Sequence, residues 1–387
     1  MNTILEGAGS LAADVRGWRR HLHQHPELSF QEKETTAFIE ARLRQFGIET
    51  LRPTPTGVVG VIQGGQPGRT VALRADIDAL PIHEENNVPY RSTRDGVMHA
   101  CGHDAHTAML LGAARVLAEH RSDLRGCVKL LFQPAEELPP GGAMQFLEAG
   151  VLDDVDAIAG LHVMSNIPAG KASIRTGVMM AHSDRFTIEI EGHGGHGASP
   201  HQTRDATLMA AQLVVNLQTI VSRRVNPSRP AVVTVGRIEA GSTFNVIAQR
   251  AQLLGTTRCF DDDVRELLRR EIERVAEHTC AMNGGSCRVD YDYGYPALVN
   301  DPGVTETLRG AAGAVLGPAN VLEQEPILGG EDFAHYTRKL PGAFLFLGAG
   351  NEQIGAAYPH HHPRFEIDES ILVSGVKILL KAALDLL

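Results

Sequence analysis

The stretch Thr70-Val71-Ala72-Leu73-Arg74-Ala75-Asp76-Ile77 decides the fold, because it is a mainly apolar run of strand length. Three similar short runs, each bounded by turn residues, occupy 57–62, 127–132 and 156–163. Amphipathic helical patterns lie around them, at 8–24, 31–46 and 105–119. Apolar strands separated by helices are typical of a parallel sheet covered by helices. We therefore expect an α/β domain with a mixed, largely parallel sheet.

The length of the chain, 387 residues, predicts two domains, since one core rarely grows so large. Near Ser183 the pattern changes, and residues 185–191 alternate apolar and polar as in a half-buried strand. A helix pattern at 204–223, strands at 231–238 and 251–258, a helix at 261–282 and a strand at 287–293 follow. This β-α-β-β-α-β order is typical of a ferredoxin-like α+β unit. We expect a discontinuous main domain, 1–182 and 296–387, with a satellite domain inserted at 183–295.

The composition excludes several classes of protein. The net charge of −10, from 36 basic and 46 acidic residues, argues against nucleic-acid and membrane partners, which need basic clusters. No apolar run approaches the roughly 18 residues that cross a bilayer, and the N-terminus lacks the pattern of a secretion signal. The five cysteines have no disulfide-framework spacing, which indicates reduced thiols and a cytoplasmic protein.

Polar side chains follow the predicted strands at the edge where an open α/β sheet binds its ligands. Asp76 and Asp78 follow the strand at 70–75, the sequence 133–137 ends in Glu136-Glu137, and His162 closes the strand at 156–160. In addition, Cys101 and His103 stand two residues apart before the helix at 105–119. We expect Asp104 to cap that helix at its N-terminus.

Each of these clusters also has an ordinary structural interpretation: a turn before a capped helix, a solvated pair of glutamates, a core histidine. Together they favour a hydrolytic metal site. Thiolate, imidazole and carboxylate ligands suit zinc or a similar first-row metal. Of two adjacent carboxylates, one can bind metal while its neighbour takes a proton from the attacking water.

Four strings carry a resemblance to a known family: 74–81 (Arg-Ala-Asp-Ile-Asp-Ala-Leu-Pro), 98–104 (Met-His-Ala-Cys-Gly-His-Asp), 133–137 (Gln-Pro-Ala-Glu-Glu) and 160–162 (Gly-Leu-His). In this order they resemble the M20 peptidase family, and more closely its amidohydrolase branch. That branch includes hippurate hydrolases, N-acyl-amino-acid amidohydrolases and plant auxin-conjugate hydrolases. The resemblance covers essentially the whole chain and includes the insert.

The resemblance implies a centre of two divalent ions per subunit, of Zn, Mn, Co or Ni, with the sequence leaving the metal open. The implied ligands are Cys101, His103, Glu137, His162 and a C-terminal histidine. Glu136 would be the general base, and Asp76 would lie behind the ligands and orient one of them. The family pattern Leu-His-Asn/Ser-Pro maps onto 360–363 and nominates His361. The triple histidine departs from that pattern and leaves His360 and His362 as alternatives.

In the insert, residues 192–201 resemble the lid motif of the family. By this match His196 would stabilise negative charge on the substrate carbonyl oxygen, in the active site of a neighbouring subunit. Asn245 matches a position that helps to bind substrate, and its alternative role is turn formation. The insert would therefore serve as a lid and dimerisation domain of a homodimer or higher homo-oligomer.

The expected reaction is hydrolysis of the amide bond of N-acetyl, N-benzoyl or similar N-acyl amino acids, or of a related small-molecule conjugate. One rival is a dipeptidase or carboxypeptidase with the same metal centre. A second rival is a non-catalytic zinc-binding protein. Structural zinc sites are closed four-ligand cages, whereas this chain offers five candidate ligands and a further carboxylate.

Overall fold

The computed structural model describes residues 2–387 and divides the chain into two compact units. The first unit contains the residues up to Met179, Val299–Glu325 and Asp332–Leu387. The second contains Met180–Leu298 and Pro326–Glu331. The second unit thus extends about three residues beyond each end of the insert expected at 183–295. The short segment 326–331 also belongs to the second unit, which the sequence did not indicate.

The first unit is built on an eight-stranded sheet with the order β1-β2-β4-β3-β5-β16-β6-β15. The strands are β1 (Glu49–Leu51), β2 (Val58–Gln63), β3 (Gln66–Asp76), β4 (Arg125–Gln133), β5 (Ala157–Pro168), β6 (Ala172–Ile174), β15 (Val321–Glu323) and β16 (Gly342–Gly350). Strands β4, β3, β5 and β16 run parallel, and β1–β2, β2–β4 and β6–β16 pair antiparallel. The prediction of a mixed, largely parallel sheet is confirmed.

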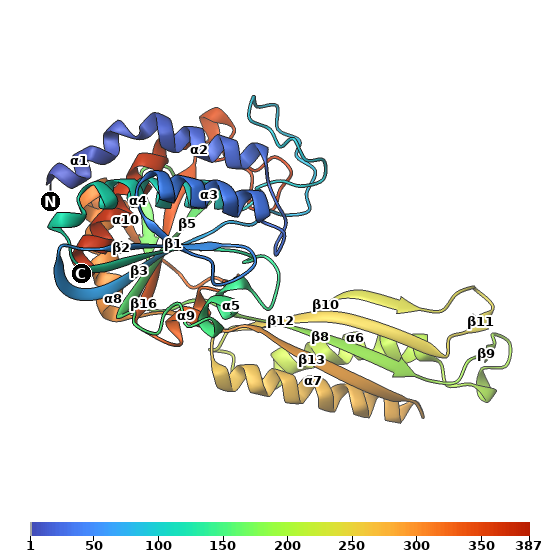
Figure 1. Ribbon diagram of the computed structural model, residues 1–387. Helices are drawn as coiled ribbons and strands as arrows, with labels where there is room; N and C mark the ends of the chain where they lie inside the picture. The colour runs from blue at the N-terminus through green and yellow to red at the C-terminus, as the bar shows by residue number, and fades with distance from the viewer. Residues whose placement is uncertain (1) are drawn as a thin grey trace. The chain divides into compact units, whose positions relative to one another are not determined.

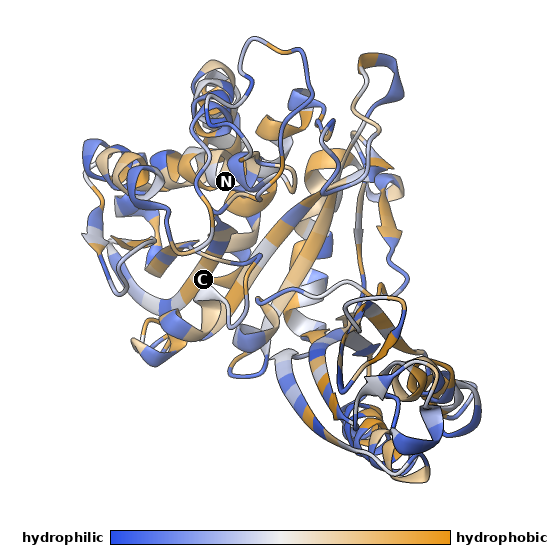
Figure 2. Cartoon of the chain, turned by 90° about the vertical axis from the view of Figure 1, so that its right-hand side faces the viewer, coloured by the Kyte–Doolittle hydropathy of each residue, from blue (hydrophilic) through white to orange (hydrophobic). Residues whose placement is uncertain are grey.

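Apolar side chains hold this sheet between helices. The central strands are mainly buried, and Figure 2 shows hydrophobic colour along them. The helices are α1 (Asn2–Ser10), α2 (Ala12–Gln24), α3 (Lys33–Gln45), α4 (His103–Glu119), α5 (Gly142–Glu148), α8 (Pro302–Leu316), α9 (Ala334–Thr337) and α10 (Leu372–Leu386). Helix α4 contacts β3 on one side and α2 and α10 on the other, while α5 and α9 lie across the sheet from it (Figure 1). Because α4 is enclosed in this way, its residues 103–114 are all buried.

The helix expected at 8–24 is wrong in one respect, because the chain forms two helices, α1 and α2, that are separated at Leu11. Gly7, Gly9 and Ser10 precede the break, and glycine in particular disfavours the helix interior. Leu11 itself is buried, with φ −89° and ψ 2°. The amphipathic pattern continues through this break. It therefore predicts a helix on both sides of Leu11 but not the interruption itself.

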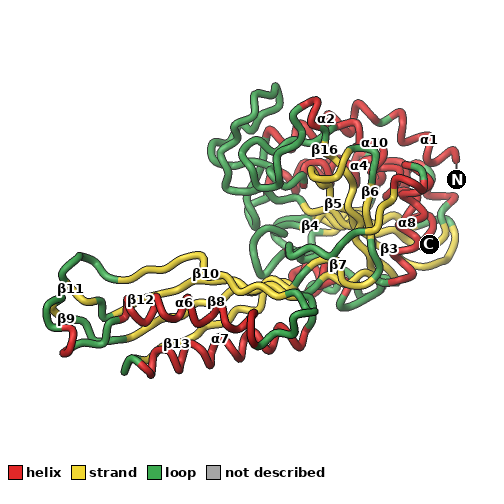
Figure 3. Tube along the Cα trace, turned by 180° about the vertical axis from the view of Figure 1, so that it is seen from behind, coloured by secondary structure: helices red, strands yellow, loops and turns green. Residues whose placement is uncertain are grey.

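The second unit contains a four-stranded antiparallel sheet with the order β10-β12-β8-β13. Its elements are β8 (His182–Glu191), β9 (Gly195–His196), α6 (Ala206–Arg223), β10 (Ala231–Ala240), β11 (Val246–Ile247), β12 (Arg250–Cys259), α7 (Asp262–Met282) and β13 (Ser286–Tyr295). Strand β8 alternates buried and less buried residues, and its buried apolar side chains, Phe186, Ile188 and Ile190, join the core beneath α6 and α7. Both helices lie together along the sheet (Figure 3). The ferredoxin-like order predicted from the sequence is confirmed.

Two further short strands, β7 (Gly177–Met180) and β14 (Leu298–Asn300), pair where the chain passes from one unit to the other. Within the described residues no helix is both long and apolar enough to cross a membrane. All five cysteines are free, and of these only Cys287 is not buried.

Candidate metal centre and active site

The start of helix α4 brings Cys101 and His103 to the edge of the sheet. Gly102 between them has φ +93°, and a Cβ atom there would lie 2.3 Å from Cγ2 of Val163. Only glycine fits this backbone, because a side chain would be strained and would collide with β5. The tight turn places Cys101 and His103 beside His162, which lies in the middle of β5 and not at the end of its strand as the sequence led us to expect.

The expectation that Asp104 caps helix α4 is wrong. The residue at the N-cap is Gly102, and Asp104 lies inside the first turn. Its buried carboxylate accepts a hydrogen bond from Nε of Arg19 at 2.9 Å, and Nδ1 of His23 lies 2.8 Å from the same oxygen. The helix begins two residues earlier than a cap at Asp104 requires, and these cationic partners on α2 hold the carboxylate instead.

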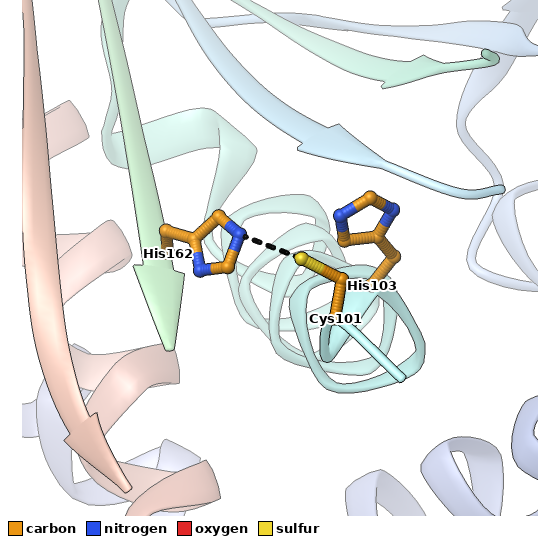
Figure 4. Close-up of side chains that lie close together, drawn as sticks. All are labelled: Cys101, His103 and His162. Carbon is orange, nitrogen blue, oxygen red and sulfur yellow. Dashed lines mark hydrogen bonds between the residues drawn. The ribbon is translucent and has the colours of Figure 1, made fainter. Parts of the chain in front are cut away.

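Cys101, His103 and His162 form a first group of candidate metal ligands, shown in Figure 4. Their ligand atoms all lie within 4.8 Å of one another, and Cys101 Sγ is 3.4 Å from His162 Nε2. Nδ1 of His162 donates to the carbonyl oxygen of Val163 at 2.7 Å. That bond places the ring proton on Nδ1 and leaves the Nε2 lone pair facing Cys101.

Cys101, Glu137 and His361 form a second group, again within 4.8 Å. His361 has φ +65°, an uncommon conformation for a residue with a side chain. Its N–H donates to the carbonyl oxygen of Ala100 at 2.8 Å, and its Nε2 lies 3.3 Å from Oε1 of Glu137. The C-terminal histidine segment is thus tied directly to the loop that carries Cys101.

The two neighbouring histidines make other contacts. His360 donates from Nε2 to the carbonyl oxygen of Val163 at 2.9 Å. His362 accepts the N–H of Arg364 on Nδ1 and stacks on the ring of Tyr358. Of the three histidines, only His361 joins a candidate ligand group within the part of the chain that the structure describes.

The donor set fits divalent metal ions. Among the described residues, His103 Nε2 and Glu137 Oε1 are buried without a hydrogen bond, which costs free energy unless a ligand satisfies them. Burial, together with Glu137 and Glu136, raises the pKa of the Cys101 thiol well above its usual range. Burial alone would lower the pKa of His103, but Asp76 and Asp78 raise it to about 10. A cation here would relieve this excess of negative charge, and because both ligand groups contain Cys101, two ions could share its sulfur.

Asp76, the last residue of β3, and Asp78, two residues later, support the histidines of α4. Asp78 accepts from Nδ1 of His103 through its carbonyl oxygen at 3.0 Å and its carboxylate at 3.2 Å. Asp76, which we expected to orient a ligand, accepts from Nδ1 of His106 at 2.6 Å and from Arg74 at 2.6 Å. Its distance to His103 Nε2 is 3.7 Å, so the direct hydrogen bond to this candidate ligand comes from Asp78. The role expected of Asp76 stays a prediction.

His106 is a buried residue of this region that the sequence did not single out as part of the site. Its Nε2 accepts the backbone N–H of Val163 at 2.9 Å, so Nδ1 carries the proton that it donates to Asp76. Both ring nitrogens are therefore engaged in hydrogen bonds and not free to bind a metal ion, although the ligand atoms of His106, His103 and Asp76 lie within 4.8 Å of one another. We interpret His106 as a residue that links α4 to the middle of β5. Its position one turn after His103 on the helix was the available signal.

The candidate general base, Glu136, is 7% exposed. It groups with His103 and Glu137, the three ligand atoms lying within 4.8 Å of one another. Glu136 and Glu137 follow β4, whose last residue Gln133 is in register with Asp76 of β3. The parallel pairing therefore delivers both aspartates and both glutamates to the same edge of the sheet.

The second unit carries the two remaining candidates, His196 and Asn245. Strand β9 pairs with β11 through His196 and Val246, and the N–H of Gly197 donates to the carbonyl oxygen of Asn245 at 2.9 Å. The two residues are thus neighbours, and both are exposed. Nδ1 of His196 accepts the N–H of Ala198 at 3.0 Å. In the neutral ring this leaves Nε2 as a hydrogen-bond donor.

Comparison with known proteins agrees with this geometry. The model of the family described as "Peptidase family M20/M25/M40" matches residues 72–385. N-acetyl-L-cysteine deacetylase of Bacillus subtilis is 46% identical, over 98% of this chain and 89% of the relative. Thermostable carboxypeptidase 2 of Saccharolobus solfataricus is 41% identical, over 94% and 93%. The solved structure of the Bacillus subtilis YXEP protein, described as a dinuclear metal binding peptidase from the M20 family, has a TM-score of 0.84 at 37% identity. It covers 98% of this chain and 99% of that one.

Proposed function

Because the chain belongs to peptidase family M20/M25/M40, we propose that it hydrolyses the amide bond of N-acyl amino acids with Glu136 as general base. The family predicted from the sequence is confirmed, and the chain is a hydrolase of amide bonds. The similarity to N-acetyl-L-cysteine deacetylase supports an N-acetyl or similar acyl group on the substrate. N-benzoyl amino acids remain candidates beside it.

One observation carries the proposal: two groups of candidate ligands share Cys101 and lie beside Glu136. The residues that would hold two divalent ions are Cys101, His103, Glu137, His162 and His361. When bound, such ions polarise the substrate carbonyl and lower the pKa of water. The thiolate, imidazole and carboxylate set accepts Zn, Mn, Co or Ni, so we leave the metal open.

The remaining chemistry belongs to the side chains. Glu136 takes a proton from the attacking water and passes it to the leaving nitrogen, so that the amine departs neutral. Its buried position excludes bulk water as a competing proton donor. Glu137, the adjacent carboxylate, would be committed to metal and so leaves this proton transfer to Glu136.

We assign substrate contact to His196 and Asn245 of the second unit. The Nε2–H of His196 would donate to the carbonyl oxygen as negative charge develops on it, an interaction worth about 3 kcal/mol in comparable sites. As in the family resemblance, we propose that this contact reaches the active site of another subunit, through a homodimer or higher homo-oligomer formed by the second unit. The five free cysteines support a reducing, cytoplasmic location.

The test is the turnover of the Glu136→Gln variant on N-acetyl and N-benzoyl amino acids, with metal content measured on the same samples. We expect kcat to fall by roughly 10²- to 10⁴-fold, while the bound metal persists. Glu148→Gln, an exposed carboxylate on α5, is the matched control and should leave kcat unchanged. Full activity of Glu136→Gln would remove Glu136 from the role of base.

A second candidate function is peptide hydrolysis at the same centre, which the similarity to thermostable carboxypeptidase 2 favours. Dipeptides with a free amino group and N-blocked peptides, assayed beside the acyl amino acids, separate the two. A higher kcat/KM on either peptide class would replace the N-acyl amino acid as the preferred substrate. It would leave the assignment of Glu136 intact.

A further inference from the structure

The backbone on both sides of Glu136 is held by two buried carboxylates. The N–H of Ala135 donates to Oε1 of Glu32 at 2.8 Å, and the N–H of Glu137 donates to Oδ2 of Asp78 at 3.0 Å. Glu32 is 0% exposed and Asp78 is 1% exposed. The peptide N–H groups of Ala135 and Glu137, one before and one after the candidate base, are thus each held by a buried carboxyl group.

Ala135 requires such support because of its backbone conformation. Its φ is +51°, in the left-handed region that residues with a Cβ atom rarely occupy. The carbonyl oxygen of Ala135 accepts the N–H of Gly142 at 3.1 Å, so both of its backbone polar groups are engaged. An unfavourable conformation of this kind persists only where the surroundings enforce it, and such sites cluster at active sites.

The position of Glu32 is fixed by helix α3. It is the N-cap residue of α3, and its carbonyl oxygen accepts the N–H of Thr36 at 3.0 Å. Within the described residues its second carboxylate oxygen, Oε2, is buried without a hydrogen bond. Burial and the nearby Asp78 raise the pKa of Glu32 to about 7. Burying a carboxyl group costs free energy, and the N–H of Ala135 is the partner that links this group to the segment of Glu136.

We propose that Glu32 is a positioning residue, which holds Ala135 in the left-handed conformation and thereby aims the carboxylate of Glu136 at the attacking water. The inference rests on the proposed role of Glu136 as base. Glu32 acts through the peptide of Ala135, and within the described residues it makes no hydrogen bond to a candidate metal ligand. Its effect should therefore fall on kcat, with little change in KM or metal content.

Three variants test this on the full-length, metal-loaded enzyme with an N-acetyl amino acid as substrate. Glu32→Ala removes the acceptor, and we expect kcat to fall at least 10-fold with KM within about 3-fold. Glu32→Gln keeps an acceptor oxygen of the same size, and we expect it to retain kcat within about 3-fold. Glu32→Ala combined with Ala135→Gly should regain at least 5-fold over Glu32→Ala, because glycine adopts a positive φ without support. The single variant Ala135→Gly shows how much the glycine alone changes kcat, and the double variant is compared with it.

Glu27→Gln is the matched control. Glu27 is also buried and accepts the N–H of Thr35 in the first turn of α3, but none of its described contacts involves residues 133–137. It should lower the melting temperature without changing kcat. If the losses in Glu32→Ala follow its melting temperature and Ala135→Gly restores nothing, Glu32 is only structural and the inference is overturned. If wild type is active and Glu32→Ala matches it, the inference is also overturned. Failure of the proposed function looks different, since Glu136→Gln would then keep wild-type activity.

Discussion

The guanidinium of Arg19 and the carboxylate of Asp104 form an ion pair, Nε to Oδ2 2.9 Å, with neither side chain exposed. Asp104 follows His103 in the first turn of α4, and Arg19 lies on α2. The same guanidinium pairs with Glu366 at 2.8 Å and with Glu369 at 3.2 Å. One side chain therefore ties the beginning of α4 to the segment that follows the C-terminal histidines.

Replacing Arg19 should destabilise the first unit strongly. Arg19→Ala leaves Asp104 buried without its main cation, and we expect a loss of about 3–5 kcal/mol in the free energy of unfolding. Arg19→Lys keeps the charge but cannot reach all three carboxylates, so its loss should be smaller, about 1–3 kcal/mol. Urea unfolding followed by the fluorescence of Trp18, the only tryptophan, measures both.

The neighbouring Arg20→Ala is the control for this pair of variants. Arg20 is 40% exposed and pairs only with Glu369 among the salt bridges described, so its removal should cost under about 1 kcal/mol. Equal losses in Arg19→Ala and Arg20→Ala would contradict a special role for the buried pair.

Much of the site follows from local sequence because parallel strands place their carboxyl ends at one edge. The runs before Asp76, Glu136 and His162 predicted both the sheet and the side chains that meet there. The apolar content of β16 indicates a strand, but nothing local shows that it lies between β5 and β6.

Local sequence is least informative for residues whose partners lie far along the chain. Asp104 resembles a cap when it is viewed beside α4 alone, and its actual partner Arg19 is 85 residues away. Glu32 precedes Ala135 by 103 residues. Their hydrogen bond occurs where Ala135 has a positive φ, and an alanine in the sequence gives no sign of that conformation. Choosing among His360, His361 and His362 likewise required the tie between His361 and Ala100.

His23 should make the stability of the first unit depend on pH on the alkaline side. Burial alone would lower its pKa, but Asp104 and Glu84 raise it to about 9 from the ordinary value of 6.5. A raised pKa means that protonated His23 stabilises the fold. The contribution is complete below about pH 6.5 and is lost as the pH rises through about 9, a loss of about 2 kcal/mol between pH 7 and 10.

The measurement is the urea midpoint of wild type and His23→Asn at pH 7 and pH 10. The variant starts less stable at pH 7 and should lose less than wild type on going to pH 10. Parallel losses in the two proteins would show that other groups carry the alkaline transition.

Single alanine variants of the three C-terminal histidines should differ sharply. His361→Ala removes a candidate ligand, and we expect bound metal and kcat to fall, kcat by roughly 10²-fold or more. His362→Ala removes the ring stacked on Tyr358 and the acceptor for the N–H of Arg364, but no candidate ligand, and it should keep kcat within about 3-fold. Metal content by elemental analysis and initial rates check both. Loss of metal in His360→Ala with retention in His361→Ala would move the ligand assignment to His360.

Metal binding should release protons, in a number that the site predicts. At pH 7 the thiol of Cys101 and the ring of His103 are both protonated, since the pKa of Cys101 is raised and that of His103 is about 10. Both must lose a proton to become ligands, so we expect release of about two protons and an affinity that falls as the pH is lowered. Calorimetric titration of metal-free protein with Zn²⁺ in two buffers of different ionisation enthalpy counts these protons. Cys101→Ser has no thiol to deprotonate and should release about one fewer, whereas equal release by both proteins would show that Cys101 does not bind as thiolate.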